Sequence, residues 1–151
     1  QKSHAWSPFN VSVGSDNRAR IMWVDNNDGQ LSFWRMGTGV FQENSRTHST
    51  SDGRTPQDSA VKTNGQSVAL WTGYKGEASL WTLNYDGSYS YENNFGPFID
   101  WTATDIELDS SNRRRLMWRN DDGRASIWVF SDDTNFTAKE HKRGDGFEPF
   151  K

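Results

Sequence analysis

The stretch Arg115–Trp128, which reads RLMWRNDDGRASIW, occurs in the chain in three related versions. The other two are Arg20–Trp34 (RIMWVDNNDGQLSFW) and Ala69–Trp81 (ALWTGYKGEASLW). Their final tryptophans are 47 residues apart in both intervals. Three repeats of this length indicate one supersecondary unit that is copied, with each copy burying a face against the next.

The start of each repeat lies 17 residues before the first tryptophan of the motif, at Trp6, Arg54 and Trp101. We therefore expect a single domain over residues 1–151, with repeats at approximately 6–53, 54–100 and 101–151, and 151 residues suffice for one core. The segment Phe147–Phe150 resembles Phe95–Phe98, and the strand that should follow it is found at Trp6. We therefore expect the N- and C-termini to meet.

Alternation and turn chemistry predict about four short strands in each repeat. Val11 and Val13 alternate with polar residues, as expected of a half-buried strand. The repeated motif reads as a hairpin whose turn ends in Gly29, Gly76 or Gly123, because glycine adopts a positive φ at little cost. The first copy has one extra residue, which we place in this turn or in a bulge. The fold class is therefore all-β, with about twelve strands.

Three copies of a four-stranded unit favour a β-trefoil over a propeller. A propeller typically needs four to eight blades, whereas three units of four strands match the trefoil barrel. The alternative is a β-propeller assembled from two chains, with six blades. Trefoils often bind carbohydrate, but this is an analogy at the level of the fold.

Composition excludes several classes of function. A net charge of −3 without a basic stripe argues against a nucleic-acid partner. No apolar run approaches the roughly 20 residues that cross a bilayer, so we expect no membrane partner. The chain has no cysteine, and its three histidines, His4, His48 and His141, occupy unrelated repeat positions. We expect no metal site, no cofactor and no catalytic triad.

The second tryptophan of each motif is the main candidate for ligand contact. In each hairpin it shares a strand face with a serine, whereas the apolar residues that alternate with them lie on the other face. This pattern favours an accessible indole, while the first tryptophans are expected to pack in the core. The fourth strand of each repeat adds one acid, and Trp6 and Trp101 are further platforms. The candidate ligand-binding residues are Trp34, Trp81, Trp128, Glu43, Glu92, Glu140, Trp6 and Trp101.

These residue types suit a carbohydrate. Sugars combine apolar C–H faces with hydroxyl groups, so an indole platform beside a carboxylate matches both parts, and a carboxylate accepts strong charge-assisted bonds. A glycosidase needs two carboxylates at one centre, and such a centre is normally unique. The threefold repetition of these acids therefore favours binding over catalysis, and we expect a protein that is not an enzyme.

The motifs LMWRNDDGRASIW, ALWTGYKGEASLW and IMWVDNNDGQLSFW, with GPFIDWTATDIEL between copies, resemble carbohydrate-binding module family 92 over nearly the whole chain. The resemblance implies a β-trefoil with up to three glucan sites, each with a Trp platform and an acidic partner. It also implies a secreted module attached to a glycoside hydrolase or another secreted protein. Arg54 departs from the pattern set by Trp6 and Trp101, which puts three equal sites in doubt.

We therefore expect a noncatalytic carbohydrate-binding module that recognises β-glucan-type polysaccharide through up to three Trp/Glu sites. β-1,3- and β-1,6-glucans are the first candidates, and carrageenan is a further one. The chain begins at Gln1, so we expect it to be a processed piece. The alternatives are a free propeller-type lectin and a protein-binding trefoil such as a protease inhibitor.

Overall fold

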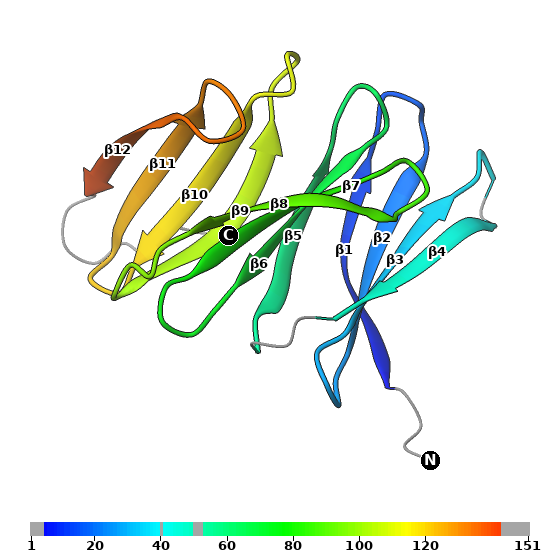
Figure 1. Cartoon of the computed structure of the whole chain (residues 1–151), viewed down its shortest axis with the longest axis horizontal. Coiled ribbons are helices and arrows are strands. Elements are labelled where there is room, and N and C mark those ends of the chain that lie inside the picture. The colour runs from blue at the N-terminus through cyan, green and yellow to red at the C-terminus, as the bar shows by residue number, and fades with distance from the viewer. Residues whose placement is uncertain (1–4, 40, 50–52, 143–151) are drawn as a thin grey trace.

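The computed structural model describes residues 5–39, 41–49 and 53–142, which form three four-stranded antiparallel sheets (Figure 1). The first sheet contains β1 (Trp6–Val13), β2 (Ala19–Asp25), β3 (Leu31–Met36) and β4 (Gln42–His48). The second contains β5 (Thr55–Val61), β6 (Ser67–Thr72), β7 (Ala78–Leu83) and β8 (Tyr89–Phe95). The third contains β9 (Trp101–Leu108), β10 (Arg114–Asn120), β11 (Arg124–Phe130) and β12 (Phe136–Lys142). The described ranges contain no helix that could cross a membrane.

The all-β prediction is confirmed, but the structure does not show the predicted trefoil. Each repeat forms its own sheet, in which strands that follow one another in the chain are hydrogen-bonded neighbours. A trefoil barrel needs strands of different repeats to pair. Among the described residues, every pair of bonded strands belongs to a single repeat. The three sheets therefore resemble consecutive propeller blades.

The prediction that the termini meet concerns residues 1–4 and 143–151, which lie outside the described ranges. Within those ranges, β1 pairs with β2 in the first sheet, and it does not complete the third repeat. Figure 1 shows the first and third sheets at opposite ends of the molecule, with the second between them.

Strand alternation gives each sheet two different faces. One face carries both tryptophans of the hairpin, and we call it the Trp face. The other carries aliphatic or aromatic residues from the same strands, and we call it the opposite face. The Trp faces are formed around Trp23 and Trp34, Trp71 and Trp81, and Trp118 and Trp128. The opposite faces are formed around Met22, Leu31 and Phe33, around Leu70, Ala78 and Leu80, and around Met117, Ala125 and Ile127.

The core consists of contacts between unlike faces. The opposite face of the first sheet packs on the Trp face of the second, where Met22 and Phe33 meet Trp71. The opposite face of the second sheet packs on the Trp face of the third, where Leu70 and Leu80 join Trp118. The sheets therefore stack in one direction, and the second and third sheets each present the Trp face to the sheet before. Large aromatic area in these contacts compensates for the low aliphatic content.

The first strands of the sheets, β1, β5 and β9, lie next to one another and are joined by polar contacts. Asn10 Nδ2 donates to Asp58 Oδ1 at 2.6 Å, and the Ile106 backbone N–H donates to Asp58 Oδ2 at 2.9 Å. Asn10, Asp58 and Asp105 each follow a β-bulge at the same point of the repeat. Asp58 therefore connects all three sheets, a contact that sequence reasoning missed.

Burial raises the pKa of Asp58 to about 6. The backbone N–H groups of Ile106 and Ser59 oppose this shift, while the nearby Asp105 carboxyl adds to it. The folded state therefore binds a proton at Asp58 more tightly than the unfolded chain does.

We predict that Leu70→Ala lowers the free energy of unfolding by about 2–5 kcal/mol, because Leu70 is 0% exposed between the second and third sheets. Ile99→Ala is the control, since Ile99 is 68% exposed and its replacement should cost no more than about 0.5 kcal/mol. Urea unfolding measures both variants. Equal losses would contradict the proposed core.

We also predict that Asp58 makes stability depend on pH. Its folded pKa of about 6 lies above the ordinary value of 3.8, so the free energy of unfolding should fall as pH rises from about 4 to about 6. Asp58→Asn should remove this fall, because asparagine does not titrate. The substitution is conservative, since the first sheet already has an asparagine, Asn10, at the corresponding position. Burial lowers the pKa of His48 and opposes the trend, so the difference between wild type and variant is the quantity to measure. The free energies of unfolding of wild type and Asp58→Asn are measured by urea unfolding from pH 4 to 7. Curves that run parallel with pH would refute the raised pKa of Asp58.

Candidate functional site

A pair of tryptophans occurs at the same place in every sheet. The ring centroids are 5.0 Å apart for Trp23 and Trp34, 4.7 Å for Trp71 and Trp81, and 5.0 Å for Trp118 and Trp128. The rings are tilted by 37–44° in all three pairs. The repeated hairpin therefore builds one indole pair three times.

The prediction that serine and the second tryptophan share a face is confirmed. Trp34 Nε1 donates to Ser32 Oγ at 2.9 Å, and Trp81 Nε1 donates to Ser79 Oγ at 3.2 Å. The prediction that this indole is freely accessible is wrong for Trp81, which is 9% exposed, because its face packs against the preceding sheet.

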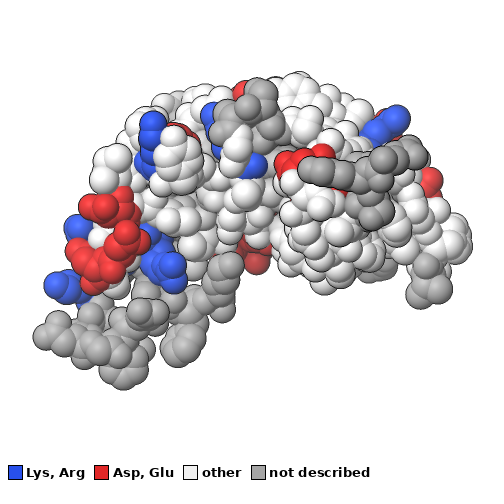
Figure 2. All heavy atoms as spheres, turned by 90° about the horizontal axis from the view of Figure 1, so that it is seen from below, with Lys and Arg blue, Asp and Glu red and all other residues white. Residues whose placement is uncertain are grey.

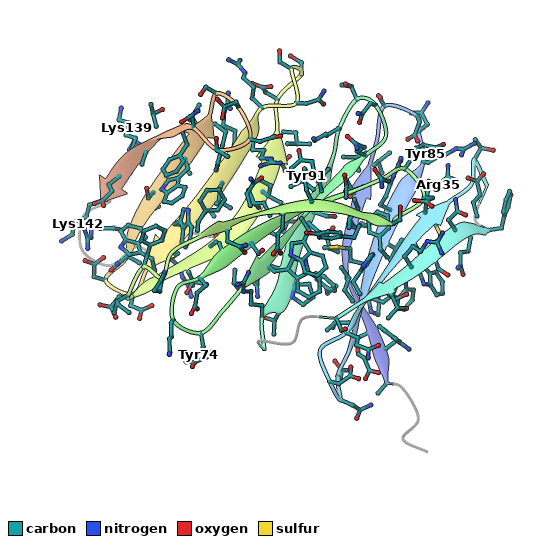
Figure 3. All side chains as sticks on the ribbon, viewed as in Figure 1. Arg35, Tyr74, Tyr85, Tyr91, Lys139 and Lys142 are labelled. Carbon is teal, nitrogen blue, oxygen red and sulfur yellow. The ribbon has the colours of Figure 1, made fainter. Side chains whose placement is uncertain are left out.

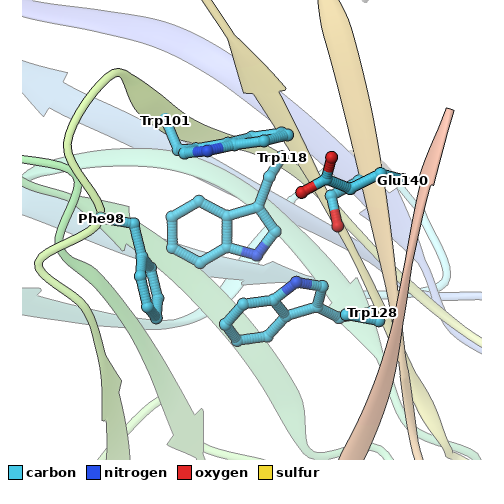
Figure 4. Close-up of a pocket in the computed structure, with 7 residues that line it drawn as sticks. Phe98, Trp101, Trp118, Trp128 and Glu140 are labelled. Atoms are coloured by element: carbon cyan, nitrogen blue, oxygen red, sulfur yellow. The ribbon is translucent and has the colours of Figure 1, made fainter. Parts of the chain in front are cut away.

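Trp128 is buried for the same reason and is 8% exposed, yet it borders a pocket of the third sheet. This pocket has a volume of about 290 Å³, near the lower end for small-molecule sites. Figure 4 shows aromatic rings on three of its sides and a carboxylate on the fourth. It is lined by Phe98, Trp101, Trp118, Ser126, Trp128, Ala138 and Glu140.

Every strand of the third sheet contributes to this pocket. Trp101 lies at the start of β9, Trp118 on β10, Trp128 on β11 and Glu140 on β12. The structure thus brings together three predicted residues, Trp101, Trp128 and Glu140. Sequence reasoning missed Phe98 as a wall, although the segment Gly96–Pro97–Phe98 directly before Trp101 was a usable signal.

Two polar groups give the pocket hydrogen-bonding capacity. One is the hydroxyl of Ser126, which lines the pocket and can donate or accept a hydrogen bond. Glu140 Oε2 accepts from Arg124 Nη1 at 3.0 Å, which leaves its second oxygen to accept from a ligand hydroxyl. The Arg124 guanidinium also lies 5.3 Å from the Trp101 ring centroid and holds Asp122 at 2.8 Å.

These ion pairs lie at one end of the molecule. In Figure 2, the charged groups on the face seen from below gather mainly at the end formed by the third sheet, where acidic and basic atoms lie side by side.

The three predicted acids do not occupy equivalent positions. Glu140 lies opposite Ser126 in the strand pairing, whereas Glu92 lies opposite Trp81. A bulge near the end of β3 shifts the register of the first sheet, and Glu43 bonds Arg18 at 2.7 Å and Arg35 at 3.2 Å.

Arg35 precedes Met36 and follows Trp34, so it projects from the opposite face of β3. Its guanidinium lies 3.8 Å from the Tyr85 ring centroid, between the first and second sheets, where Figure 3 shows the two side chains close together. The structure therefore does not bring Glu43 to Trp34.

The second sheet fills the corresponding place with a polar network. Arg54 stands where the third sheet has Trp101, and its Nη1 donates to Asn94 Oδ1 at 2.6 Å. Ser79 Oγ donates to the same oxygen at 2.7 Å and lies 3.3 Å from Glu92 Oε2. Trp81 and Glu92 are thus close together, but arginine replaces the aromatic wall.

The first sheet has the aromatic residues without the acid. Trp6 is half-buried at the start of β1, and Trp34 is half-buried on the Trp face. Opposite Ser32, where the third sheet has Glu140, lies Thr47. In the described part of the chain, no group of three or more His, Cys, Asp or Glu residues could hold a metal ion.

Comparison with solved structures finds proteins with a similar arrangement of strands. Aleuria aurantia lectin is one of them. Its structure in complex with alpha-methyl-L-fucoside matches with a TM-score of 0.57 and 10% identity, over 81% of this chain and 40% of the lectin. A protein of unknown function from Bacteroides caccae matches with a TM-score of 0.49 and 8% identity, over 98% of this chain and 66% of its own. The chain spans less than half of the lectin's length, and the likeness concerns the fold.

No family model and no curated protein matches the sequence. The resemblance to carbohydrate-binding module family 92 therefore stays a prediction.

The wall formed by Phe98 depends on a glycine. Gly76 ends the second hairpin turn with φ 77°, and the Phe98 backbone N–H donates to its carbonyl oxygen at 3.1 Å. A Cβ atom at Gly76 would collide with the Phe98 carbonyl oxygen. Only glycine therefore lets this connection lie against the turn.

We predict that Gly76→Ala destabilises the protein more than Gly29→Ala does. The two glycines end the corresponding hairpin turns of the second and first repeats, with φ 77° and 73°. Both variants therefore incur about 1–2 kcal/mol of backbone strain. A Cβ at Gly29 would meet nothing within 4 Å, whereas the one at Gly76 must displace the Phe98 backbone, which should add about 1–3 kcal/mol. Thermal and urea unfolding measure the difference, and equal losses would show that the Phe98 connection yields freely.

Proposed function

We propose that this chain is a noncatalytic carbohydrate-binding module that recognises β-glucan-type polysaccharide. The observation that carries the proposal is the pocket of the third sheet, where Trp101, Trp118 and Trp128 meet Glu140. Its principal ligand-binding residues are Trp101, Trp128 and Glu140.

The chemistry of the pocket matches the two sides of a sugar ring. Half-buried Trp101 and the exposed edge of Phe98 offer apolar surface to C–H groups. Glu140 accepts from hydroxyl groups, and the Ser126 hydroxyl can donate to or accept from them. Small-molecule sites usually combine mostly apolar walls with a few polar groups of this kind.

Binding fits the pocket better than hydrolysis. Glycoside hydrolysis normally uses two carboxyl groups on either side of the bond that breaks. Glu140 is the single carboxylate among the residues that line this pocket, and Arg124 neutralises part of its charge. The proposed protein is therefore not an enzyme.

The three sites are unequal in this proposal. The third sheet has the complete set, the second has Trp81 and Glu92 beside Arg54, and the first has Trp6 and Trp34 with Thr47 in place of the acid. Sites of different strength on one molecule can still act together on a polymer, with gains of roughly 10²–10⁴ in apparent affinity when they reach it at once.

The likeness to a fucoside-bound lectin supports the general class of ligand, while the glucan type rests on the sequence resemblance. The resemblance also supports the further proposals of a secreted protein and of attachment to a glycoside hydrolase or another secreted partner. Such modules hold their partner near a polymer.

Affinity electrophoresis tests the proposal. Gels that contain β-1,3-, β-1,6- or β-1,4-glucan or carrageenan should retard the protein in at least one β-glucan. Trp101→Ala removes an aromatic platform and Glu140→Gln removes a charged acceptor, so each should raise the apparent Kd by about tenfold or more. Glu107→Gln is the control, because Glu107 is exposed on β9 outside the pocket.

Titration with alpha-methyl-L-fucoside separates the parts of the proposal. Binding of the fucoside without any retardation by glucans would overturn the glucan specificity and keep the carbohydrate class. Absence of binding to every polysaccharide and to the fucoside would overturn carbohydrate binding itself.

A further inference from the structure

Among residues 5–39, 41–49 and 53–142, every inner face of the stack packs on a neighbouring sheet, whereas the two outermost faces have no such neighbour. Leu70 and Leu80, on the opposite face of the second sheet, are 0% exposed, and Met22 and Phe33 in the first sheet are 0% and 1% exposed. The third sheet holds Met117 and Ile127 at these positions, and both are only half-buried. Its opposite face thus has an apolar centre at Met117 and Ile127, flanked on β10 by Arg115 and Arg119, and this centre corresponds to the residues that are fully buried in the other two sheets.

The first sheet shows the converse at its Trp face. Trp71 and Trp118 are 0% and 1% exposed because a preceding sheet covers them, whereas their counterpart Trp23 is half-buried. Ile21, the counterpart of the fully buried Leu116, is half-buried as well. The stack therefore ends in one uncovered Trp face and one uncovered opposite face, which are the two surfaces that join inside the molecule.

A ring contact repeated inside the molecule indicates how these end faces would meet. His48 pairs with Leu31 at the end of β4, and its ring packs edge-on against Trp81 of the next sheet at 6.0 Å and 88°. Phe95 holds the same position in β8, and its ring packs edge-on against Trp128 of the next sheet at 5.6 Å and 88°.

His141 holds this position in β12, opposite Ala125, and it is exposed. The bulge in the first sheet hides the equivalence of His48 and His141 in the sequence, so the prediction that they occupy unrelated positions is wrong. Lys139, which pairs with Ile127, likewise corresponds to Arg46, which pairs with Phe33, and Figure 3 shows Lys139 projecting from the outer end of the molecule. The third sheet therefore carries a contact surface that no other sheet of the described residues covers.

We propose that two copies of this chain close into a ring of six sheets. The opposite face of the third sheet of each copy packs on the Trp face of the first sheet of the other, and His141 packs on Trp34 of the other copy. This inference does not depend on the proposed ligand.

The number of copies follows from the blade count and from the comparison. Propellers typically contain four to eight blades, so two copies fit and three copies, with nine sheets, do not. Because 81% of this chain matches 40% of the Aleuria aurantia lectin, that lectin is about twice as long, which is the length of two copies. The two contacts are equivalent by twofold symmetry, so no unsatisfied end remains.

The polar contacts between the first strands of the sheets, β1, β5 and β9, would continue across the contact between the two copies. Asp58 accepts from the backbone N–H of Ile106, the residue that follows Asp105 in the next sheet. Asp105 stands at the same position of β9 and would meet Val11, which follows Asn10, in the other copy.

Sedimentation velocity and light scattering on the intact chain test the proposal without any glycan. The expected mass is twice the chain mass of 17.3 kDa. A monomer at all concentrations, or an assembly of three or more copies, would overturn the ring.

Substitutions at the end faces test the geometry. Ile127→Glu and Ile21→Glu each place a charge on one end face and should each give folded monomers, as judged by circular dichroism and a cooperative unfolding transition. Ile99→Glu is the matched control, because Ile99 is 68% exposed in the connection before β9 and should leave the dimer intact. Folded Ile127→Glu and Ile21→Glu proteins that stay dimeric would overturn the assigned faces.

His141→Ala provides a test that does not endanger folding, since His141 is exposed. It should weaken the dimer by several-fold in Kd, whereas Lys142→Ala, at the neighbouring exposed position, should not. An equimolar mixture of Ile127→Glu and Ile21→Glu proteins retains one intact contact, so it should form a weak mixed dimer that neither protein forms alone. Absence of this mixed dimer together with an unchanged His141→Ala dimer would also overturn the proposal.

Discussion

Contact between the Trp face of one sheet and the opposite face of the sheet before it is the interaction on which this structure depends. A chain with 32% hydrophobic residues has little aliphatic area to bury, and its eight tryptophans supply much of the missing area. Trp71 and Trp118, which lie at the two internal contacts, are almost completely buried. Because the two faces differ, each contact has a direction, and both internal contacts run in the same direction.

The same contact explains where a ligand can bind. In the second and third sheets the centre of the Trp face is used for packing, so Trp81 and Trp128 are not open platforms and only the margin of the face stays accessible. In the third sheet Trp101, Phe98 and Glu140 surround this margin and leave a pocket. In the second sheet, Arg54 bonds Asn94 at the corresponding place. Differences at the margin therefore change the site while the core stays the same.

Much of the fold follows from local patterns in the sequence. The 47-residue period, the hairpin glycines and the alternation of residues predict the strands and the two faces of each sheet, because they depend on neighbours in the chain. Gly29, Gly76 and Gly123 all adopt the positive φ that the turns require. The extra residue of the first repeat lies in the hairpin turn, between the paired residues Val24 and Leu31.

The arrangement of the repeats could not be predicted in the same way. A trefoil and a row of separate sheets use the same antiparallel hairpins, and they differ in pairing between strands that are far apart in sequence. The register of the fourth strand was equally hidden, since a bulge at Met36 shifts the first sheet by one residue relative to the third. For this reason Glu43 and Glu140 looked alike in sequence and lie on different faces, whereas His48 and His141 looked unrelated and share a position.

The pocket draws its walls from two structural units. Phe98 belongs to the connection that leaves the second sheet and is anchored on the turn at Gly76, whereas Trp128 and Glu140 belong to the third sheet. A molecule bound there would touch both units at once and act as a clamp across their boundary. Occupancy would then raise the free energy needed to separate the sheets, since a ligand that binds only the folded arrangement stabilises it by mass action. Ligand affinity and the stability of the contact between the second and third sheets would thus be thermodynamically linked.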